Sequence, residues 1–395
     1  MIGERTLPRG WKLGQLVDAA DIERNAIDPT TLEGSYEYLG LEHIDGATGD
    51  ASFSSTEEIE LRSTKFAFTP QHVLFGKLRP NLRKIARPEK SGICSTDILP
   101  ILPKVGVLDR GYLFHYLRSP SMVRLAVSRT SGANLPRLSP GILAEFPMVF
   151  PVELAEQKRI AAILDKADAI RRKRQQAIQL ADEFLRSVFL EMFGDQFYSK
   201  NLADGVALGQ VCESIVVGHV GSTSDYYAYE GVTFLRTQNV RPMKIDLRDV
   251  KLITEDFHKK LRKSTIRVGD VLISRVGVNR GMAAVVPKEL DEANCANIIV
   301  VRPGKNISGE FLAYLINSPF GQNTLVGMTV GAAQGVINTT TVKNWLIPNL
   351  PLAQQQEFSA KLKMVARLKE RQGIQLDESN YLFGSLSQRA FQGEL

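Results

Sequence analysis

Cysteine and histidine are scarce in this chain of 395 residues. The cysteines, Cys94, Cys212 and Cys295, are far apart, odd in number and outside any CxxC spacing, which argues against a disulfide framework and a zinc site. We therefore expect buried thiols. The five histidines form neither an HxxxH nor an HExxH pair, so no single helix face could chelate a metal through two imidazoles.

Long hydrophobic runs are also missing. No stretch approaches roughly 18 uncharged apolar residues, and the start, MIGERTLPRGWKLGQ, carries charges and prolines where a secretory signal needs an apolar segment. We therefore expect a cytoplasmic protein with no membrane partner. Its 44% hydrophobic and 23% charged residues are typical of a globular protein, and its length predicts two or three domains.

The charge of the chain favours a polyanionic partner. The formal net charge is +6 and the pI is near 9.1. Between Lys77 and Lys90 there are six basic residues and one acid, Glu89. Such a local density is typical of contacts to nucleic-acid phosphates, which depend on salt but not on sequence.

The chain contains a duplication at an offset of 198 residues. The segment PVELAEQKRIAAIL at Pro151 matches LPLAQQQEFSAKL at Leu350, and VLFGKLRPN (73–81) matches VLISRVGVN (271–279). Each half is therefore a variable stretch of mixed α/β character, with short apolar runs bounded by turn residues, followed by a similar long helix. A repeat of this length is a duplicated domain and not a solenoid unit.

Both long helices carry a heptad seam that is polar at its centre, which favours a coiled coil. Because the second globular domain starts where the first helix ends and finishes where the second begins, we expect antiparallel helices that act as a stiff spacer between the domains. The predicted seams are Ile160, Leu164, Ala167, Arg171, Arg174, Ile178, Ala181, Leu185, Val188 and Met192, and Phe358, Leu362, Val365, Lys369, Gln372, Leu376, Ser379, Phe383, Leu386 and Ala390.

These observations predict a mixed α/β (α+β) protein with a pseudo-twofold internal repeat. The predicted parts are a first recognition domain (1–150), a first spacer helix (151–195), a second recognition domain (196–348) and a second spacer helix (349–395). The RRKR run at 171–174 is interpreted as a solvated face or a set of partner contacts, with contacts to DNA phosphates as the alternative.

This order of parts resembles the specificity subunit of type I restriction-modification enzymes. The resemblance rests on the repeated helix starts, on GAAQGVIN at Gly331 and VGDVLISRVG at Val268, and on YYAYEGVTFLRTQNV at Tyr226. It covers essentially the whole chain, although GANLPRLS and HIDG in the first half depart from the pattern of the second.

The resemblance implies a non-catalytic DNA reader. Each target-recognition domain would contact one part of a bipartite, asymmetric site in double-stranded DNA, and the conserved helices would bind two modification subunits. No cofactor is expected in this chain. The modification subunits would methylate adenine with S-adenosylmethionine, and restriction subunits would use ATP and Mg²⁺ for translocation and cleavage.

Enzyme motifs give no support for catalysis within the chain. The NSPF tetrapeptide (317–320) is one residue from an adenine-methyltransferase motif, but its counterpart RSPS (118–121) has the same helix-ending position, so we predict a turn. GHVG at Gly218 lacks the Lys-Ser/Thr of a P-loop. Two other functions remain open: a bimodular DNA-binding protein outside restriction-modification, and a coiled-coil scaffold.

Candidate DNA contacts follow from the chemistry of base reading, in which Arg or Lys pairs with guanine and Asn or Gln with adenine, with phosphate contacts around them. They lie in polar loops of both halves: Lys77, Arg79, Asn81, Arg83, Lys84 and Arg137 in the first, and Gln238, Asn239, Arg241, Arg275, Asn279, Arg280, Gln334 and Asn338 in the second.

Overall fold

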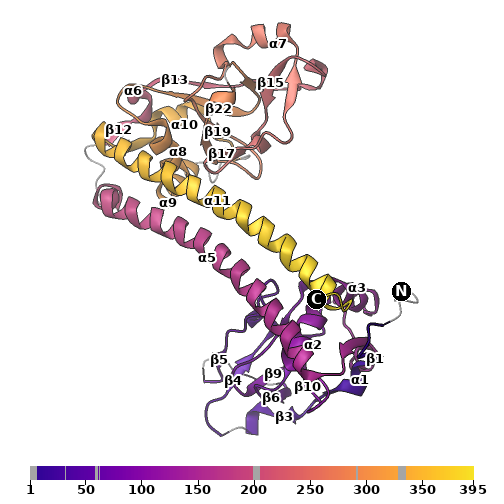
Figure 1. The fold of residues 1–395 in the computed structure, drawn as a ribbon. Helices are drawn as coiled ribbons and strands as arrows, with labels where there is room; N and C mark the ends of the chain where they lie inside the picture. The colour runs from indigo at the N-terminus through magenta and orange to yellow at the C-terminus, as the bar shows by residue number, and fades with distance from the viewer. Residues whose placement is uncertain are drawn as a thin grey trace. The chain divides into compact units, whose positions relative to one another are not determined.

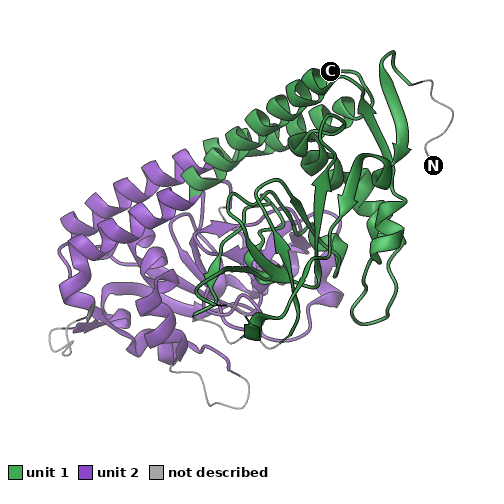
Figure 2. Cartoon of the chain, turned by 90° about the horizontal axis from the view of Figure 1, so that it is seen from below, with its two compact units in different colours: residues 1–178, 371–395 green, residues 179–370 purple. Residues whose placement is uncertain are grey.

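The computed structural model describes residues 7–31, 33–57, 61, 63–198, 205–290, 292–327 and 335–395. The chain forms two compact units, which divide the long helices between them (Figure 2). Unit 1 contains residues 1–178 and 371–395, and unit 2 contains residues 179–370. The four domain ranges expected from the sequence treat the helices as separate parts and stay a prediction.

Unit 1 is a mixed α/β unit with three sheets (Figure 1). Strand β1 (Trp11–Gln15) pairs with β11 (Pro147–Pro151). A four-stranded sheet has the order β2 (Ala20–Ile22), β10 (Ile98–Pro103), β7 (Val73–Gly76) and β8 (Ile85–Ala86), and a five-stranded sheet has the order β3 (Ala26–Ile27), β6 (Lys65–Phe68), β9 (Gly92–Ser95), β4 (Glu37–Leu39) and β5 (Ser54–Ser55). The shorter helices are α1 (Leu16–Ala19), α2 (Arg110–Arg118), α3 (Pro120–Ser128) and α4 (Pro140–Ala144).

Unit 2 repeats the two-stranded and the antiparallel four-stranded sheet of unit 1. The matching sheets are β12 (Gly205–Ala207) with β23 (Leu346–Pro348), and β13 (Cys212–Val217), β22 (Ile298–Pro303), β19 (Val271–Ser274) and β20 (Ala283–Val285) in that order. The remaining sheets are β14 (Tyr227–Ala228), β18 (Lys251–Ile253), β15 (Val232–Leu235) and β21 (Asn294–Cys295), and β16 (Val240–Arg241) with β17 (Lys244–Ile245). Its shorter helices are α6 (Leu208–Val211), α7 (Glu255–Lys260), α8 (Gly309–Asn317), α9 (Pro319–Gly321) and α10 (Thr339–Asn344).

The two long helices are α5 (Leu154–Tyr198) and α11 (Leu352–Ala390). They run antiparallel in each unit, because rising numbers in α5 meet falling numbers in α11. In unit 1 the Arg171 guanidinium lies 4.7 Å from the Phe383 ring, and Arg174 is hydrogen-bonded to Gln375. In unit 2 Asp182 forms an ion pair with Lys369, and the Lys361 Nζ donates to the Met192 Sδ (3.7 Å). Every predicted seam position is buried or half-buried. The repeat and the antiparallel long helices are thus confirmed.

The ends of the helices complete the core of each unit. In unit 1, Ile160, Leu164 and Ala390 pack in one cluster with the four-stranded sheet and α2. In unit 2, Phe193 and Phe358 pack in the same way against Phe311 of α8, with ring centroids 5.3 and 6.2 Å from it. A large apolar area is removed from water at both sites, so each long helix is part of its domain and not an appendage.

A buried glutamine fixes the start of each long helix to its domain. In unit 1 the Gln157 Oε1 accepts from Asp109 N (2.7 Å), while its Nε2 donates to Val107 O (2.9 Å) and Pro151 O (2.7 Å). Asp109 is also the N-cap of α2, because its carboxylate accepts from Tyr112 N. One amide therefore satisfies three backbone groups and joins α5, α2 and the end of β11.

Gln355 repeats this arrangement in unit 2. Its Oε1 accepts from Ser308 N (3.0 Å), the N-cap of α8, and its Nε2 donates to Asn306 O (3.1 Å) and Leu350 O (2.9 Å). Both glutamines are buried, with 0% exposure for Gln157 and 4% for Gln355. Because the two glutamines make equivalent hydrogen bonds, each half of the repeat needs its own glutamine to fix the long helix to the domain.

We predict that Gln157→Ala destabilises unit 1 and Gln355→Ala destabilises unit 2, each by about 2–4 kcal/mol, since buried backbone groups lose their partners. Native-state hydrogen exchange at α2 and α8 measures the two effects separately. Gln175→Ala, at an exposed position of α5, is the matched control. Equal protection in all three variants would contradict the prediction.

Candidate nucleic-acid interface

Three loops converge in unit 2, and they carry most of the predicted contacts of the second half. The Asn279 Nδ2, in the loop between β19 and β20, donates to Thr237 O and Val240 O (both 3.2 Å). On its other side this loop meets the segment before α10, where Ile337 N donates to Arg275 O (3.1 Å). Residues 237–241, 275–280 and 335–338 therefore form one surface.

Two of the predicted base readers in unit 2 point inward. Asn239 is 2% exposed, and its Oδ1 accepts from Arg236 N (2.9 Å) while its Nδ2 donates to Asp246 O (2.9 Å). Asn279 is 6% exposed and joins two loops as described above. In this structure backbone groups occupy the Asn239 amide and the Asn279 Nδ2, so both side chains position the loops.

The other predicted residues of unit 2 lie nearer the solvent. Gln238 and Arg241 are exposed: the Gln238 Nε2 donates to Asp249 Oδ2 (2.7 Å), and the Arg241 Nη1 donates to Asn279 Oδ1 (3.1 Å). Asn338 is exposed and caps α10 by accepting from Thr341 N (2.8 Å). Gln334 lies outside the described residues, and Arg275 and Arg280 are half-buried, with the Arg280 guanidinium hydrogen-bonded to Gly335 O.

Unit 1 has the same convergence of three loops. Arg79 N donates to Pro136 O (2.8 Å), which joins the loop 77–84 to the loop 131–138. The Lys84 Nζ donates to Ile44 O (2.5 Å), which joins the first of these to the loop 44–50. The loops thus have equivalent places in the two units, although their sequences differ.

Asp97 holds two of the predicted basic residues of unit 1. Arg137 makes a two-point contact to its carboxylate (3.0 and 3.2 Å), and the Lys77 Nζ lies 3.7 Å from it. The hydrogen bond from Arg137 is the main reason why the pKa of Asp97 lies below its usual value. Both cations are therefore already paired with a carboxylate.

The remaining predicted residues of unit 1 differ in exposure. Arg79 and Asn81 are exposed: Arg79 directly precedes the 3₁₀ turn Pro80–Leu82, and Asn81 lies within it. Arg79 and Arg83 have left-handed φ angles of 48° and 54°, which bend the loop sharply. Arg83 is half-buried, and its Nη2 donates to Arg118 O (3.1 Å); burial lowers its pKa. The outward-facing groups of this loop are therefore Arg79 and Asn81.

His43 is a structural residue that sequence reasoning missed. Its Nδ1 accepts from Gly40 N (3.0 Å) across a 3₁₀ turn at Leu41–His43, as Asn239 does from Arg236 N across the turn at Thr237–Asn239. HIDG (43–46) and NVRP (239–242) are therefore counterparts at an offset of 196, not 198. The sequence contained the equivalent position, but histidine and asparagine are different residue types, so matching letters between the halves did not pair His43 with Asn239.

The NSPF tetrapeptide is a turn, as predicted. The Asn317 Nδ2 donates to Ala283 O and Ala313 O (both 2.7 Å), its Oδ1 accepts from Ala283 N (3.1 Å), and the Ser318 Oγ caps the following helix. Its counterpart in unit 1 is Arg118, which donates to Ile85 O (3.2 Å). The Asn317 side chain therefore anchors strand β20.

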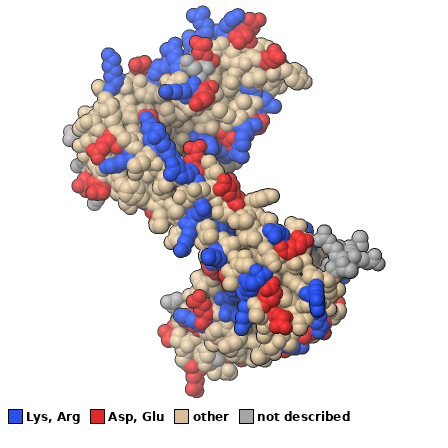
Figure 3. All heavy atoms as spheres, viewed as in Figure 1, with Lys and Arg blue, Asp and Glu red and all other residues tan. Residues whose placement is uncertain are grey.

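Acidic and basic side chains are interspersed on the visible face of the molecule (Figure 3). On the face seen in Figure 3, Lys and Arg lie among Asp and Glu on both units and form no uninterrupted basic area. In the described part of the chain, no cluster of three or more His, Cys, Asp or Glu side chains could hold a metal ion. The described helices likewise include none with the length and hydrophobicity of a membrane span.

Comparison with known proteins identifies the class of the first half. The family model for the type I restriction modification DNA specificity domain matches residues 8–180. The EcoDI specificity subunit of Escherichia coli is 26% identical over 193 residues, which cover 48% of this chain and 42% of that subunit. The EcoBI subunit of E. coli is 22% identical over 71% of this chain and 65% of its own length, and the StySPI subunit of Salmonella potsdam is 24% identical over 73% and 66%. The chain thus matches less than two thirds of the EcoDI and EcoBI subunits.

Solved structures show the same fold. The S subunit of a type I restriction-modification system from M. genitalium has a TM-score of 0.60 at 13% identity, over 99% of both chains. A chain from a type I R-M system studied for complex assembly and conformational transition has a TM-score of 0.57 at 22% identity, over 99% of this chain and 100% of that one. The resemblance inferred from the repeat is therefore confirmed: residues 8–180 match the specificity-domain family, the chain is similar in sequence to type I specificity subunits, and it shares the fold of the solved structures.

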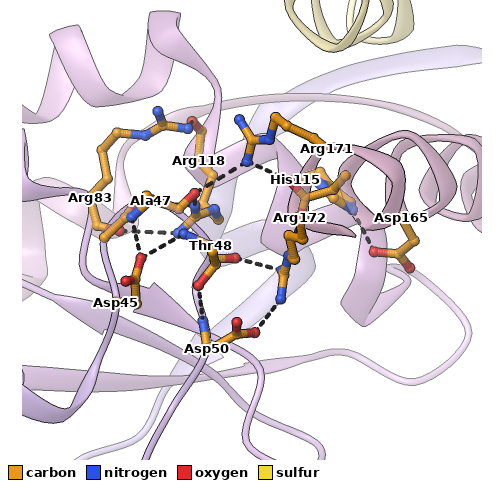
Figure 4. Close-up of polar contacts among 12 residues, drawn as sticks. Asp45, Ala47, Thr48, Asp50, Arg83, His115, Arg118, Asp165, Arg171 and Arg172 are labelled. Carbon is orange, nitrogen blue, oxygen red and sulfur yellow. Dashed lines mark hydrogen bonds and ion pairs between the residues drawn. The ribbon is translucent and has the colours of Figure 1, made fainter. Parts of the chain in front are cut away.

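A buried histidine of unit 1 contacts a carboxylate of α5. His115 is 4% exposed and contacts Asp165 of α5 at 2.7 Å (Figure 4). The Asp165 carboxylate also accepts from Arg87. Burial lowers the pKa of His115, although the carboxylate opposes this shift. Burial alone would raise the pKa of Asp165, but the hydrogen bonds from His115 and Arg87 outweigh it and lower the pKa. Both shifts make the unfolded chain bind more protons than the folded one.

We predict that unit 1 loses stability as the pH falls below the ordinary histidine pKa of about 6.5, by up to roughly 1.4 kcal/mol per pH unit while only the unfolded histidine is protonated. Asp165 adds to the loss below about pH 4. Hydrogen exchange at α2 between pH 8 and 5.5 measures the effect. His115→Gln should flatten the profile; an unchanged profile would mean that other groups cause it.

Proposed function

We propose that this chain is the DNA-reading subunit of a type I restriction-modification complex. Each unit would contact one part of a bipartite, asymmetric site in double-stranded DNA. The observation that carries the proposal is the three-loop surface, which occurs once in each unit with different exposed side chains. Two equivalent surfaces with different chemistry suit a site whose two halves differ in sequence.

The exposed side chains have the chemistry of base and phosphate recognition. In unit 1 these are Arg79 and Asn81, and in unit 2 they include Gln238 and Arg241. Arginine can pair in two-point fashion with guanine, and Asn and Gln can do so with adenine. The internal bonds of Gln238 and Arg241 would have to be exchanged for contacts to DNA, whereas the inward amides Asn239 and Asn279 would keep the loops in place.

Catalysis would be supplied by partners. The tetrapeptide that comes nearest to an adenine-methyltransferase motif is a helix-capping turn whose Asn317 amide is occupied. Adenine methylation with S-adenosylmethionine would therefore take place on modification subunits, and ATP- and Mg²⁺-dependent translocation and cleavage on restriction subunits. The chain itself would be non-catalytic.

Matched apolar side chains support docking of two identical partners on the long helices. In unit 1, Ile170 and Leu382 are 46% and 55% exposed; in unit 2, Leu368 and Phe184 occupy the equivalent positions and are 48% and 51% exposed. Each unit thus presents one apolar pair, with one member from α5 and one from α11. We also infer that the helices set the gap between the two half-sequences.

A reconstituted complex tests the reading function. We expect no label in DNA when the purified chain is incubated with labelled S-adenosylmethionine, and methylation of a bipartite site when the modification subunit is added. Asn81→Ala should relax one half-sequence and Arg241→Ala the other, since each removes an exposed group from one unit. Label transferred by the chain alone, or both substitutions acting on the same half, would contradict the proposal.

A stoichiometry measurement tests the docking sites. Ile170→Glu with Leu382→Glu should remove one of two modification subunits, and Phe184→Glu with Leu368→Glu the other, because a buried unpaired carboxylate opposes association. Native mass spectrometry counts the bound subunits. Ile374→Glu, at an exposed position where the other helix carries Gln176, is the control. Two bound subunits in every variant would place docking elsewhere.

The two other functions predict different results. A bimodular DNA-binding protein outside restriction-modification would bind DNA but would not associate with a methyltransferase. A coiled-coil scaffold would bind partners on its helices while substitutions in the loops left DNA binding unchanged. The family relationship favours the restriction-modification complex over both.

A further inference from the structure

The loop at Asp45–Asp50 of unit 1 is closed by its own hydrogen bonds. The Asp45 Oδ1 accepts from Ala47 N (2.7 Å) and Thr48 N (2.8 Å), and Asp45 N donates to Asp50 O (2.9 Å). A Cβ added at Gly46 would lie 2.0 Å from Leu82 O, so glycine permits the loop to press against the loop 77–84. The position of one loop therefore fixes that of the other.

Arg118, at the end of α2, joins these two loops. It is 6% exposed, and its Nη2 donates to Gly46 O (3.2 Å) and Ala47 O (2.7 Å). Its Nη1 donates to Arg83 O and Ile85 O (both 3.2 Å). Burial lowers its pKa to about 10, which leaves the group charged at neutral pH. All four acceptors are backbone carbonyls. The Arg118 side chain therefore stabilises the geometry of the two loops and does not serve to bind an acidic side chain.

Helix α5 reaches the same loop through two consecutive arginines. The Arg172 Nη2 donates to Thr48 O (2.7 Å), and its Nη1 is hydrogen-bonded to Asp50. The Arg171 Nη2 donates to Ala47 O (3.3 Å). Figure 4 shows Arg118, Arg171 and Arg172 directed at the backbone of the loop from two helices. We call these three residues the arginine clasp.

Asp168, one turn earlier on α5, orients the helix side of the clasp. It is 5% exposed and accepts from Arg171 (2.5 Å) and from the Arg172 Nε (2.6 Å). The side chains of Arg171 and Arg172 are only 18% and 31% exposed. The two residues are therefore held within unit 1 and differ from the solvated face expected for the RRKR run.

The repeat does not provide the same contacts in unit 2. The positions equivalent to Arg118, Arg171 and Arg172 are Asn317, Lys369 and Glu370. A glutamate side chain accepts hydrogen bonds and cannot donate to a loop carbonyl when ionised. The clasp is therefore specific to the first half.

We propose that Arg171 and Arg172 are positioning residues for DNA recognition by unit 1. Through the loop 45–50 and Arg118 they fix the loop 77–84, which carries Arg79 and Asn81. Specificity for one half-sequence thus depends on side chains of the long helix, while the other half-sequence does not depend on them. This inference rests on the proposed function.

The test uses the complete methyltransferase complex and the methylated sequences that it produces. Arg172→Ala should raise methylation of sites with mismatches in one half by about tenfold, the discrimination of roughly one two-point base contact. That half is the one that Asn81→Ala relaxes. Recognition of the other half should be unchanged. A role in stability alone would lower methylation of all sites without relaxing either half.

Asp50→Asn provides a second, milder variant and separates positioning from phosphate binding. Asp50 has 63% of its side chain exposed, so its replacement should not impair folding. Positioning predicts that it relaxes the same half as Arg172→Ala and that neither variant changes the salt dependence of binding. If Arg172 instead binds a phosphate, Arg172→Ala lowers the salt slope by about one and Asp50→Asn tightens binding to all DNA.

Arg186→Ala, at an exposed position of α5 in unit 2, is the control for loss of a helix charge and should change neither half-sequence. Unchanged specificity in the Arg172→Ala and Asp50→Asn complexes would overturn the inference while the DNA-reading function stands. A complex of the unaltered chain that recognises no bipartite site would instead overturn the proposed function.

Discussion

The structure depends on how each long helix is joined to its domain, and in both units a buried amide makes that joint. Gln157 and Gln355 are buried, and each binds three backbone groups. Apolar packing alone would press helix and domain together without fixing their angle, because it has no direction. Hydrogen bonds are directional. Those that join each glutamine to the N-cap residue of α2 or α8, and to the segment before the long helix, therefore fix how the long helix is rotated about its axis and how far it is shifted along it. The loops that face outward are then held at defined positions relative to it.

Sequence reasoning predicted the parts of the fold that repeat. The matched helix segments, the seam and the α/β character were accessible because hydrophobic periodicity and an offset of 198 can be read without coordinates. The order of the strands could not be read, and it differs between the halves where their sequences differ most. In the five-stranded sheet of unit 1, β9 lies between β4 and β6, whereas in the described part of unit 2 the strand β21 is at the end of its sheet, beside β15.

The site residues were harder to predict, because residue type does not reveal direction. Asn239 and Asn279 have the right chemistry for adenine, yet their amides are buried on backbone groups. Arg83 and Lys84 are as basic as Arg79, yet they are half-buried and donate to carbonyls within unit 1, whereas Arg79 is exposed. Loops of irregular shape need internal donors and acceptors, since they lack the regular ladder of a sheet or helix. A polar loop therefore contains both kinds of residue, and only the fold distinguishes them.

The asymmetry of the arginine clasp has a consequence for exchanging recognition domains between related proteins. A graft that ends at Pro151, before α5, would transfer the loop 45–50 without its partners Asp168, Arg171 and Arg172. A graft of the second domain has no such requirement at Lys369 and Glu370. The useful junction for the first module therefore lies beyond Arg172, inside the helix, where the exchanged segment carries its own support.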